Sequence, residues 1–182
     1  AAGLKSGRFC ENQCGTGFVM ETPRRAMPSS MHGSDLFCQV GESPDVMRHK
    51  AAIRRNEPSL PLKCMIRDQL LASSHSFFDY GCGHGEDIAF AARHGVDSAG
   101  WDPVFRPGAA RSSADIVNIG FVINVIEDVH ERAKTLRDAW TLAERLLTVS
   151  SRLSVDGRSQ AEVLYGDGVI TRGGTFQKYY PQ

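Results

Sequence analysis

The chain has 182 residues, which is enough for one domain with a substantial core. Its 21 Lys and Arg residues balance 21 Asp and Glu residues, so the net charge indicates no particular class of partner. No apolar run approaches the ~20 residues that span a bilayer, and the first residues lack the apolar core of a secretory signal. We therefore expect a soluble, cytoplasmic protein without membrane contact.

Five cysteines are an odd number, which favours a reducing compartment over a disulfide framework. Cys10 and Cys14 are close in the chain and Cys38 follows, but no second close pair or histidine pair completes a set of four zinc ligands. We therefore expect no metal site.

The first 46 residues are rich in Gly, Ser, Pro and Met, and their few apolar residues follow no regular spacing. We expect an irregular extension over residues 1–46 and a helical lead-in over residues 47–74. A helix is predicted over residues 46–55, with Ser43 in position to cap it. Two prolines then interrupt the chain, and apolar residues at helical spacing predict a second, amphipathic helix over residues 61–72.

The lead-in also carries an excess of positive charge. Between positions 47 and 67, Glu57 is the only acidic residue and six residues are basic: Arg48, Lys50, Arg54, Arg55, Lys63 and Arg67. Such a stretch could contact phosphates. The alternative is a solvated helix face that has no partner.

Residues 75–153 show a regular alternation of strand and helix patterns. Strands are predicted over residues 76–80, 96–102, 115–119 and 146–151, and helices over residues 86–94 and from position 127 onward. Such alternation favours an α/β domain, a parallel sheet with helices on both faces. The polar residues 154–182 contain glycine turns around a short strand-like run, and we expect them to form a separate C-terminal segment.

The first predicted strand runs into a glycine-rich turn. Asp79 lies near the end of the strand, and Gly81, Gly83 and Gly85 then alternate over five residues. Glycines at alternate positions allow positive φ and leave no Cβ between the backbone and a ligand. Two acidic residues follow, which suits the positive end of a helix dipole. The turn therefore predicts a nucleotide-type cofactor loop.

A second carboxylate supports this interpretation. Asp102 closes the second predicted strand, 17 residues after Gly85, close to where βαβ cofactor folds place the acid that binds a ribose. A carboxylate can accept hydrogen bonds from both ribose hydroxyls. The alternative is an ordinary turn aspartate, held in place by Pro103.

The order of the acid and the glycines, D-x-G-x-G-x-G, resembles class I S-adenosylmethionine (SAM)-dependent methyltransferases and differs from the G-x-G-x-x-G of nicotinamide enzymes. The resemblance implies a Rossmann-like fold over residues 75–153 with SAM as its cofactor. It also implies eight residues that contact the cofactor: Asp79, Tyr80, Gly81, Cys82, Gly83, Gly85, Asp102 and Asn118.

One part of the methyltransferase plan is short. Only 12 residues separate Asp102 from Asp115, so we expect a sheet that is shortened around its third strand. That strand normally ends beside the adenine of the cofactor. Ser113, Ala114 or Asn118 is expected to supply the adenine contacts instead.

Five segments resemble more closely the methyltransferases associated with DNA phosphorothioation: residues 48–53, 78–87, 100–103, 117–128 and 174–179. The likeness covers about residues 47–180, and members of that family continue beyond it, so the chain resembles an N-terminal portion. The resemblance implies a methyltransferase in a bacterial DNA-modification system. DNA is then the partner expected at the basic stretch.

Methyl transfer from a sulfonium depends on alignment of donor and acceptor more than on acid–base groups, so the sequence identifies no catalytic residue directly. Asn118 and Phe121 are candidates, because amino-methylating DNA enzymes carry [N/D/S]-P-P-[Y/F/W] after the fourth strand, although both prolines are absent here. The alternative for both residues is packing at the strand end. A rival hypothesis for the whole chain is a non-catalytic accessory protein that binds SAM or nucleic acid.

Overall fold

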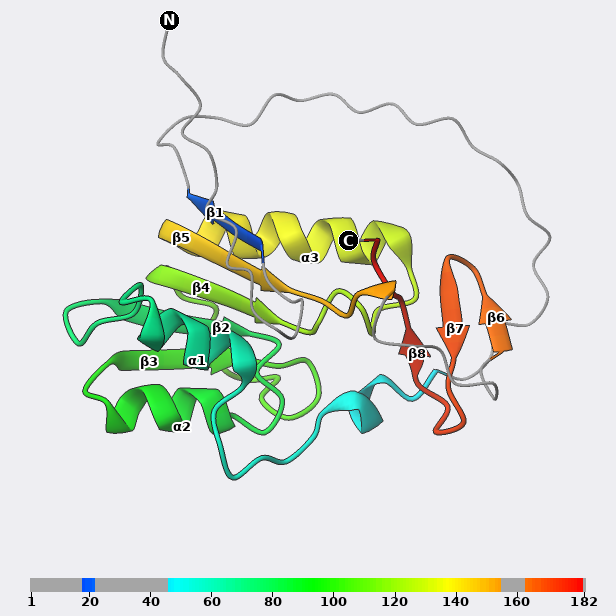
Figure 1. Ribbon diagram of the computed structural model, residues 1–182, viewed down its shortest axis with the longest axis horizontal. Coiled ribbons are helices and arrows are strands. Elements are labelled where there is room, and N and C mark those ends of the chain that lie inside the picture. Colours follow the sequence, from blue (N-terminus) through cyan, green and yellow to red (C-terminus); the bar gives the residue numbers. More distant parts are fainter. Residues whose placement is uncertain (1–17, 22–45, 155–162, 182) are drawn as a thin grey trace, which may run out of the picture.

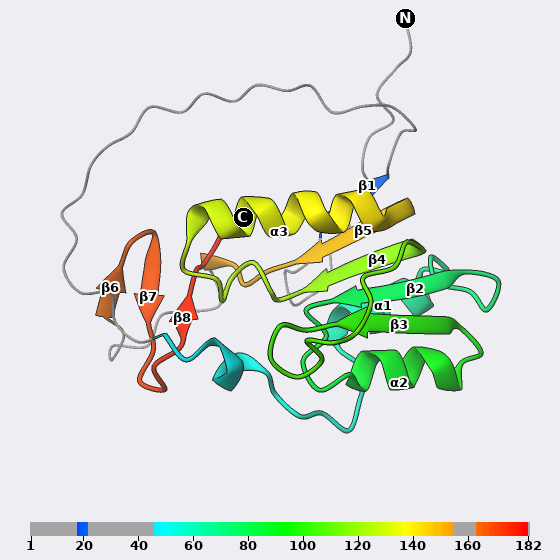
Figure 2. The same ribbon diagram turned by 180° about the vertical axis from the view of Figure 1, so that it is seen from behind.

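The computed structural model describes residues 18–21, 46–154 and 163–181 of the chain. They form one five-stranded sheet with helices packed on it and one three-stranded sheet (Figures 1 and 2). The large sheet consists, in spatial order, of β1 (Phe18–Glu21), β5 (Ala143–Ser150), β4 (Ala114–Gly120), β2 (Ser76–Tyr80) and β3 (Asp97–Trp101). Its last four strands are parallel, and β1 pairs antiparallel with β5.

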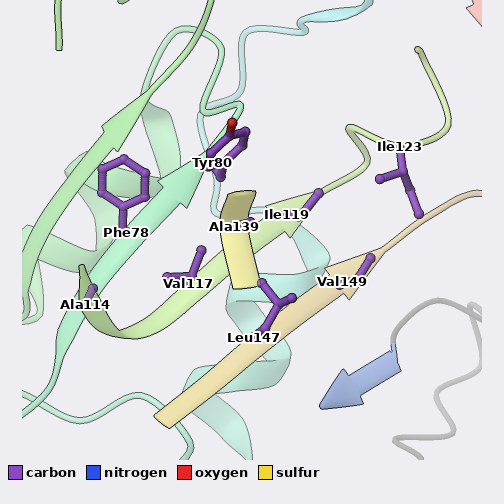
Figure 3. Close-up of a cluster of buried hydrophobic side chains, with 9 residues drawn as sticks. All are labelled: Phe78, Tyr80, Ala114, Val117, Ile119, Ile123, Ala139, Leu147 and Val149. Atoms are coloured by element: carbon purple, nitrogen blue, oxygen red, sulfur yellow. The ribbon is translucent and has the colours of Figure 1, made fainter. Parts of the chain in front are cut away.

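Helices cover both faces of this sheet. They are the 3₁₀ turn η1 (Arg48–Ala51) and the α-helices α1 (Leu60–Arg67), α2 (Glu86–Arg93) and α3 (Val129–Leu142). Ala139 of α3 packs in one buried cluster with Phe78 and Val117 (Figure 3). Leu62 of α1 and Ala91 of α2 pack in a second cluster on the other face. The α/β fold predicted for this part of the chain is confirmed.

The strand sequences explain why two cores form. Successive side chains of a strand point to opposite faces, so Phe77 and Phe78 enter different clusters, as do Ile116 and Val117. All four side chains are at most 2% exposed. Parallel strands covered on both faces are therefore apolar without interruption, which is the pattern seen in the sequence.

The sheet is shortened where the sequence predicted it. β3 lies at the edge of the five-stranded order, and the chain reaches β4 through turns and one isolated bridge between Asp102 and Arg106. No strand is formed by residues 102–113 of the described chain.

The helix predicted over residues 46–55 is wrong. Only η1 forms there, with no side-chain cap, and Ser43 lies outside the described residues. Long-range contacts explain the difference. The Met47 amide donates to the Gly174 carbonyl (2.9 Å), and the Arg48 side chain is held by two acidic side chains near the start of α3.

The second helix of the lead-in begins as predicted and ends early. Ser59 caps α1 by accepting a hydrogen bond from the Leu62 amide, and a proline occupies the first turn. The helix stops at Arg67 rather than near position 72, because Gln69 adopts a left-handed conformation with φ of 57°.

The strand β1 departs from the expectation of irregular structure over residues 1–46. It adds an antiparallel edge to β5, whereas residues 1–17 and 22–45 lie outside the described part of the chain. None of the helices in the described ranges combines the length and the apolar character that a bilayer-spanning segment requires.

The C-terminal residues form the small antiparallel sheet of β6 (Val163–Tyr165), β7 (Gly168–Ile170) and β8 (Phe176–Gln177). Backbone hydrogen bonds attach the chain around β8 to the large sheet, from Lys178 to the Asn124 carbonyl (2.8 Å) and from Tyr180 to the Arg152 carbonyl (2.9 Å). The small sheet therefore stands beyond the carboxyl ends of the parallel strands, as Figure 1 shows.

Candidate cofactor-binding site

A cleft of about 1020 Å³ lies at the carboxyl ends of β2 and β4. The chain continues from β2 to β3 on one side and from β4 to β5 on the other, so these two neighbouring strands mark the point where the strand order reverses. Open α/β sheets bind ligands in the crevice at this point. Three separate segments complete the wall of the cleft: the lead-in around η1, the loop after β4, and the small sheet.

The glycine turn forms one wall. Gly81, Gly83 and Gly85 all adopt positive φ, of 82°, 54° and 88°. The turn is held against β3, because the amides of Gly81 and Cys82 both donate to the Trp101 carbonyl (2.8 and 3.1 Å). A Cβ on Gly81 would stand 2.5 Å from a methyl group of Val122. The glycine turn therefore packs closely against the Val122 side chain and the Trp101 backbone, and it also borders the cleft.

Seven of the eight residues predicted to contact a cofactor line this cleft: Asp79, Tyr80, Gly81, Cys82, Gly83, Asp102 and Asn118. The eighth, Gly85, is the left-handed N-cap of α2, and a Cβ there would meet the guanidinium of Arg106 at 2.6 Å. The fold thus gathers the predicted set from β2, the glycine turn, β3 and β4.

Asp79 is a buried carboxylate in the cleft whose pKa is raised. Its carboxylate is 4% exposed and accepts a hydrogen bond from the Asn118 amide nitrogen (2.8 Å). Burial raises the pKa of Asp79 to about 7, and the nearby charge of Asp87 adds to that shift, against the opposing hydrogen bond from Asn118. A cation bound beside Asp79 would stabilise its ionised form.

Asn118 connects two strands across the centre of the sheet. Its nitrogen donates to Asp79 of β2, and its Oδ1 accepts from the Thr148 hydroxyl of β5 (2.9 Å). These two contacts determine which way the carboxamide points, and Asn118 is 1% exposed. Asn118 therefore orients Asp79, and its oxygen is already engaged by Thr148.

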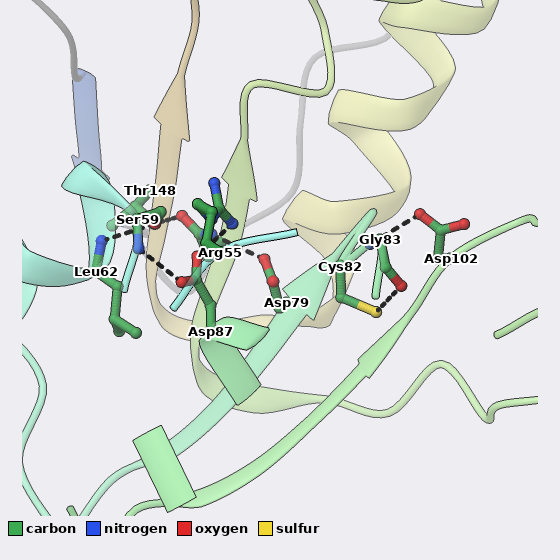
Figure 4. Close-up of polar contacts among 10 residues, drawn as sticks. Arg55, Ser59, Leu62, Asp79, Cys82, Gly83, Asp87, Asp102 and Thr148 are labelled. Carbon is green, nitrogen blue, oxygen red and sulfur yellow. Dashed lines mark hydrogen bonds and ion pairs between the residues drawn. The ribbon is translucent and has the colours of Figure 1, made fainter. Parts of the chain in front are cut away.

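Arg55 was not singled out as a site residue by the sequence. It lines the cleft, and its guanidinium lies 3.5 Å from Asp87 (Figure 4). Asp87 is 3% exposed and also accepts from the Ser59 amide (2.8 Å), so it ties the lead-in to the start of α2. The only sequence signal for this contact was the acidic first turn of α2, and the basic partner stands 32 residues earlier.

Asp102 holds both the turn after β3 and the glycine turn. Its Oδ1 accepts from the amides of Val104 and Phe105 (both 2.9 Å), which is the turn role. Its Oδ2 accepts from the Gly83 amide (2.9 Å), which links β3 to the glycine turn (Figure 4). A carboxylate has about four acceptor sites, so this arrangement leaves one on Oδ2 for a ligand hydroxyl.

Of the three residues expected to contact the adenine, the cleft includes Asn118 alone. Ser113 and Ala114 stand at the amino end of β4, and neither lines the cleft. Instead, Val104, an apolar side chain that is 53% exposed, lines the cleft beside Asp102. Arg111 also lines it, with its guanidinium 3.8 Å from the centre of the Trp101 ring.

Phe121 has an unusual backbone conformation, and Cys82 is a buried thiol. Phe121 lines the cleft with φ of 60°, a left-handed conformation that is costly for a bulky residue, and its amide donates to the Ser150 carbonyl (2.9 Å). Cys82 is 6% exposed, and burial raises the pKa of its thiol to about 12. At neutral pH the Cys82 thiol is therefore protonated and a poor nucleophile.

Comparison with known proteins found a remote structural similarity. No model of a known protein family matches the chain, and no curated protein matches it. Among solved structures, the chain is similar to the X-ray structure of the sugar N-methyltransferase KedS8 from a Streptoalloteichus species. The identity is 15% and the TM-score 0.45, over 87% of this chain and 86% of that chain. At this distance the similarity carries no functional argument, and function must be argued from the cleft.

Proposed function

We propose that the chain is a SAM-dependent methyltransferase that binds SAM in this cleft. The observation that carries the proposal is the convergence of three features on one crevice: the glycine turn, the buried carboxylate of Asp79, and Asp102 at the end of β3. The residues fit the cofactor. Asp79 suits the ammonium of the methionine moiety, the free acceptor site of Asp102 suits a ribose hydroxyl, and Val104 offers an apolar surface to a base.

SAM supplies an activated methyl group, whose S–C electron pair returns to sulfur when the acceptor's lone pair takes the carbon. The proton of the acceptor then leaves to solvent. The chain has to orient the donor and exclude water. Asp79 and Asp102 would hold the two ends of the donor, and the lead-in borders the same cleft, where Arg48 bridges to Glu127 and Glu131 (both 2.7 Å).

Asp102 gives the sharpest test of this proposal. Asp102→Asn keeps the turn, since an asparagine Oδ1 accepts from the same two amides, but it replaces the Oδ2 acceptor with a donor. We expect about tenfold weaker binding of S-adenosylhomocysteine, corresponding to one lost hydrogen bond to a charged group, together with a lower melting temperature, because the Gly83 amide also loses its acceptor. Calorimetry and thermal unfolding measure the two quantities.

Asp102→Ala is the companion variant, and it should lose both the affinity and part of the stability, because the amides of Val104 and Phe105 lose their acceptor. If the wild-type chain binds neither SAM nor S-adenosylhomocysteine, or if Asp102→Asn binds as tightly as wild type, the proposal fails.

DNA as the acceptor follows from the resemblance to the phosphorothioation-associated family, and the charges of the lead-in give it limited support. Four of the six basic residues have acidic partners: Arg48, Arg55, Lys63 and Arg67. Within the described chain, Lys50 and Arg54 have no ion pair. Retention of the protein on DNA that falls steeply with salt would support this partner. If DNA is retained without any transfer of methyl groups, the accessory role is supported instead.

A further inference from the structure

The wall of the cleft formed by the loop after β4 and the small sheet contains an acceptor atom without a donor. Asn124 is 2% exposed and lines the cleft, and its amide nitrogen donates to Gln177 Oε1 (3.4 Å). Its Oδ1 has no hydrogen-bond partner among the described residues. Buried polar atoms are nearly always paired, so this oxygen requires an explanation.

The orientation of the Asn124 carboxamide follows from its neighbours. Gln177 is 8% exposed, and its Nε2 donates to the Lys178 carbonyl (2.9 Å), which directs Oε1 towards Asn124. An oxygen of Gln177 must face a donor, so the nitrogen of Asn124 points to Gln177 and Oδ1 remains unpaired. If the Asn124 carboxamide were reversed, its Oδ1 would face Gln177 Oε1, and Oδ1 would still have no donor.

The position of this pair is held independently of any ligand. The Asn124 carbonyl accepts from the Lys178 amide (2.8 Å), so the loop after β4 and the chain after β8 are joined by the backbone. Thr175 and Thr171 continue the same wall, with their hydroxyl oxygens 2.7 Å apart. The wall is therefore rigid and polar, and these four side chains carry no charge.

From this geometry we propose that Asn124 and Gln177 form the subsite for the methyl acceptor, and that Asn124 Oδ1 accepts a hydrogen bond from an uncharged N–H or O–H group of a small polar molecule. The chemistry of the atom sets the class, since a carbonyl-type oxygen binds donors and repels a phosphodiester, whose oxygens are only acceptors at neutral pH. The inference rests on the proposed function, because it assumes that the glycine turn and Asp102 hold the donor elsewhere in the same cleft.

A small molecule fits this end of the cleft better than a nucleic acid. The lead-in closes the wall on the outer side: Met47 is bonded to Gly174 of the small sheet, and Arg48 is paired with Glu127 and Glu131. Arg48 and these two acids together carry one net negative charge, which disfavours a phosphate backbone at this rim. A small compound with uncharged hydroxyl or N–H groups carries no phosphate for this charge to repel.

The first test observes the subsite directly. Protein saturated with S-adenosylhomocysteine and labelled with ¹⁵N is titrated with glucose, which presents neutral hydroxyl donors, and separately with dimethyl phosphate, which presents acceptors only. We expect glucose to shift the side-chain amide resonances of Asn124 and Gln177 and dimethyl phosphate to leave them unchanged. The exposed Asn56 provides the internal control resonance, which should not move. Absence of a glucose shift overturns the proposal, as does a larger shift with single-stranded DNA than with glucose.

A paired variant separates a ligand role from a structural one. Asn124→Leu with Gln177→Met replaces both carboxamides with apolar groups of similar size, which costs little when the polar pair is itself incompletely bonded. We expect the melting temperature to stay within about 3 °C of wild type, and the affinity for S-adenosylhomocysteine to stay within about twofold. The response to glucose should disappear.

The same variant distinguishes failure of this inference from failure of the proposed function. A wild-type chain that does not bind S-adenosylhomocysteine contradicts the proposed function. Normal binding of that ligand, combined with a glucose response that survives in the paired variant or with a fall in melting temperature well beyond 3 °C, contradicts the acceptor subsite alone.

Discussion

At the scale of single residues, the fold changes the proton affinity of Asp79. An aspartate at the end of a strand would be ionised in water at neutral pH, but here it is buried beside Asp87 and receives one hydrogen bond from Asn118. Its pKa rises from an ordinary 3.8 to about 7. The folded state therefore binds this proton more tightly than the unfolded state does.

The stability of the ligand-free protein should depend on Asp79 in a defined direction. Because the pKa is higher in the folded state, the contribution of Asp79 is fully present below about pH 4 and is lost as the pH rises through about 7. Between pH 5 and pH 7.5 we expect wild type to lose about 2 kcal/mol that Asp79→Asn does not lose. Urea unfolding at the two pH values measures the difference, and parallel pH dependences for the two proteins would contradict it.

Cofactor binding should act on the same proton. A ligand ammonium beside Asp79 favours the carboxylate, so the pKa of Asp79 falls when the ligand binds. At pH 7, where the ligand-free group is near its midpoint, binding of S-adenosylhomocysteine should release about half a proton. Calorimetry in two buffers of different ionisation enthalpy gives this number. Asp79→Asn is the control, and proton release that persists in it would assign the proton to another group.

At the scale of elements, the contact between β2 and β3 depends on a residue without a side chain. Gly100 lies opposite Asp79 in the register of the two strands. A Cβ at Gly100 would stand 2.7 Å from the Asp79 carbonyl oxygen and 2.6 Å from the end of the Ile88 side chain. Ile88 can move, but the carbonyl belongs to a central strand.

Gly100→Ala should therefore lower the free energy of unfolding by about 1–3 kcal/mol through overpacking. The matched control is Gly108→Ala, because a Cβ at Gly108 meets no atom within 4 Å and the backbone there is unstrained. Chemical denaturation of both variants tests the difference. Equal stabilities of the two variants would show that β3 can shift away from β2 without cost.

At the scale of the whole molecule, the small sheet is attached to α3 by a buried ion pair. The Arg132 side chain is 6% exposed and pairs with Asp167, which also pairs with Lys178 (2.7 Å). Although partial burial raises the pKa of Asp167, the hydrogen bond from Arg132 keeps it below its usual range. The attachment matters for function, because the small sheet supplies one wall of the cleft.

Asp167→Ala should destabilise the protein by about 2 kcal/mol, since it leaves the Arg132 guanidinium buried without its acid, and the partial exposure of Asp167 reduces the effect. In an Arg132→Met background the same substitution should cost much less. The double-mutant cycle is measured by urea unfolding. Equal costs in the two backgrounds would mean that the pair does not couple the sheet to α3.

Residues that act through local geometry were predictable from the sequence. The alternating glycines had to adopt unusual φ values near a strand end, and the apolar runs had to be strands buried on both faces. The start of α3 was also recognisable, because Asp128 caps it through the Glu131 amide (2.6 Å). These features depend on a few consecutive residues, so the local sequence is enough to predict them.

Only the tertiary structure decided which distant residues contact one another. The helix expected at residues 46–55 is replaced by one turn, because Met47 and Arg48 are bonded to residues far along the chain. Asn118 joins Asp79 to Thr148, and Asn124 meets Gln177, across separations of 30 to 53 residues. Strength and direction of a hydrogen bond depend on distance and burial in the folded chain, and sequence spacing specifies neither. The sequence by itself determined the glycine turn, and the fold decided which side chains surround it.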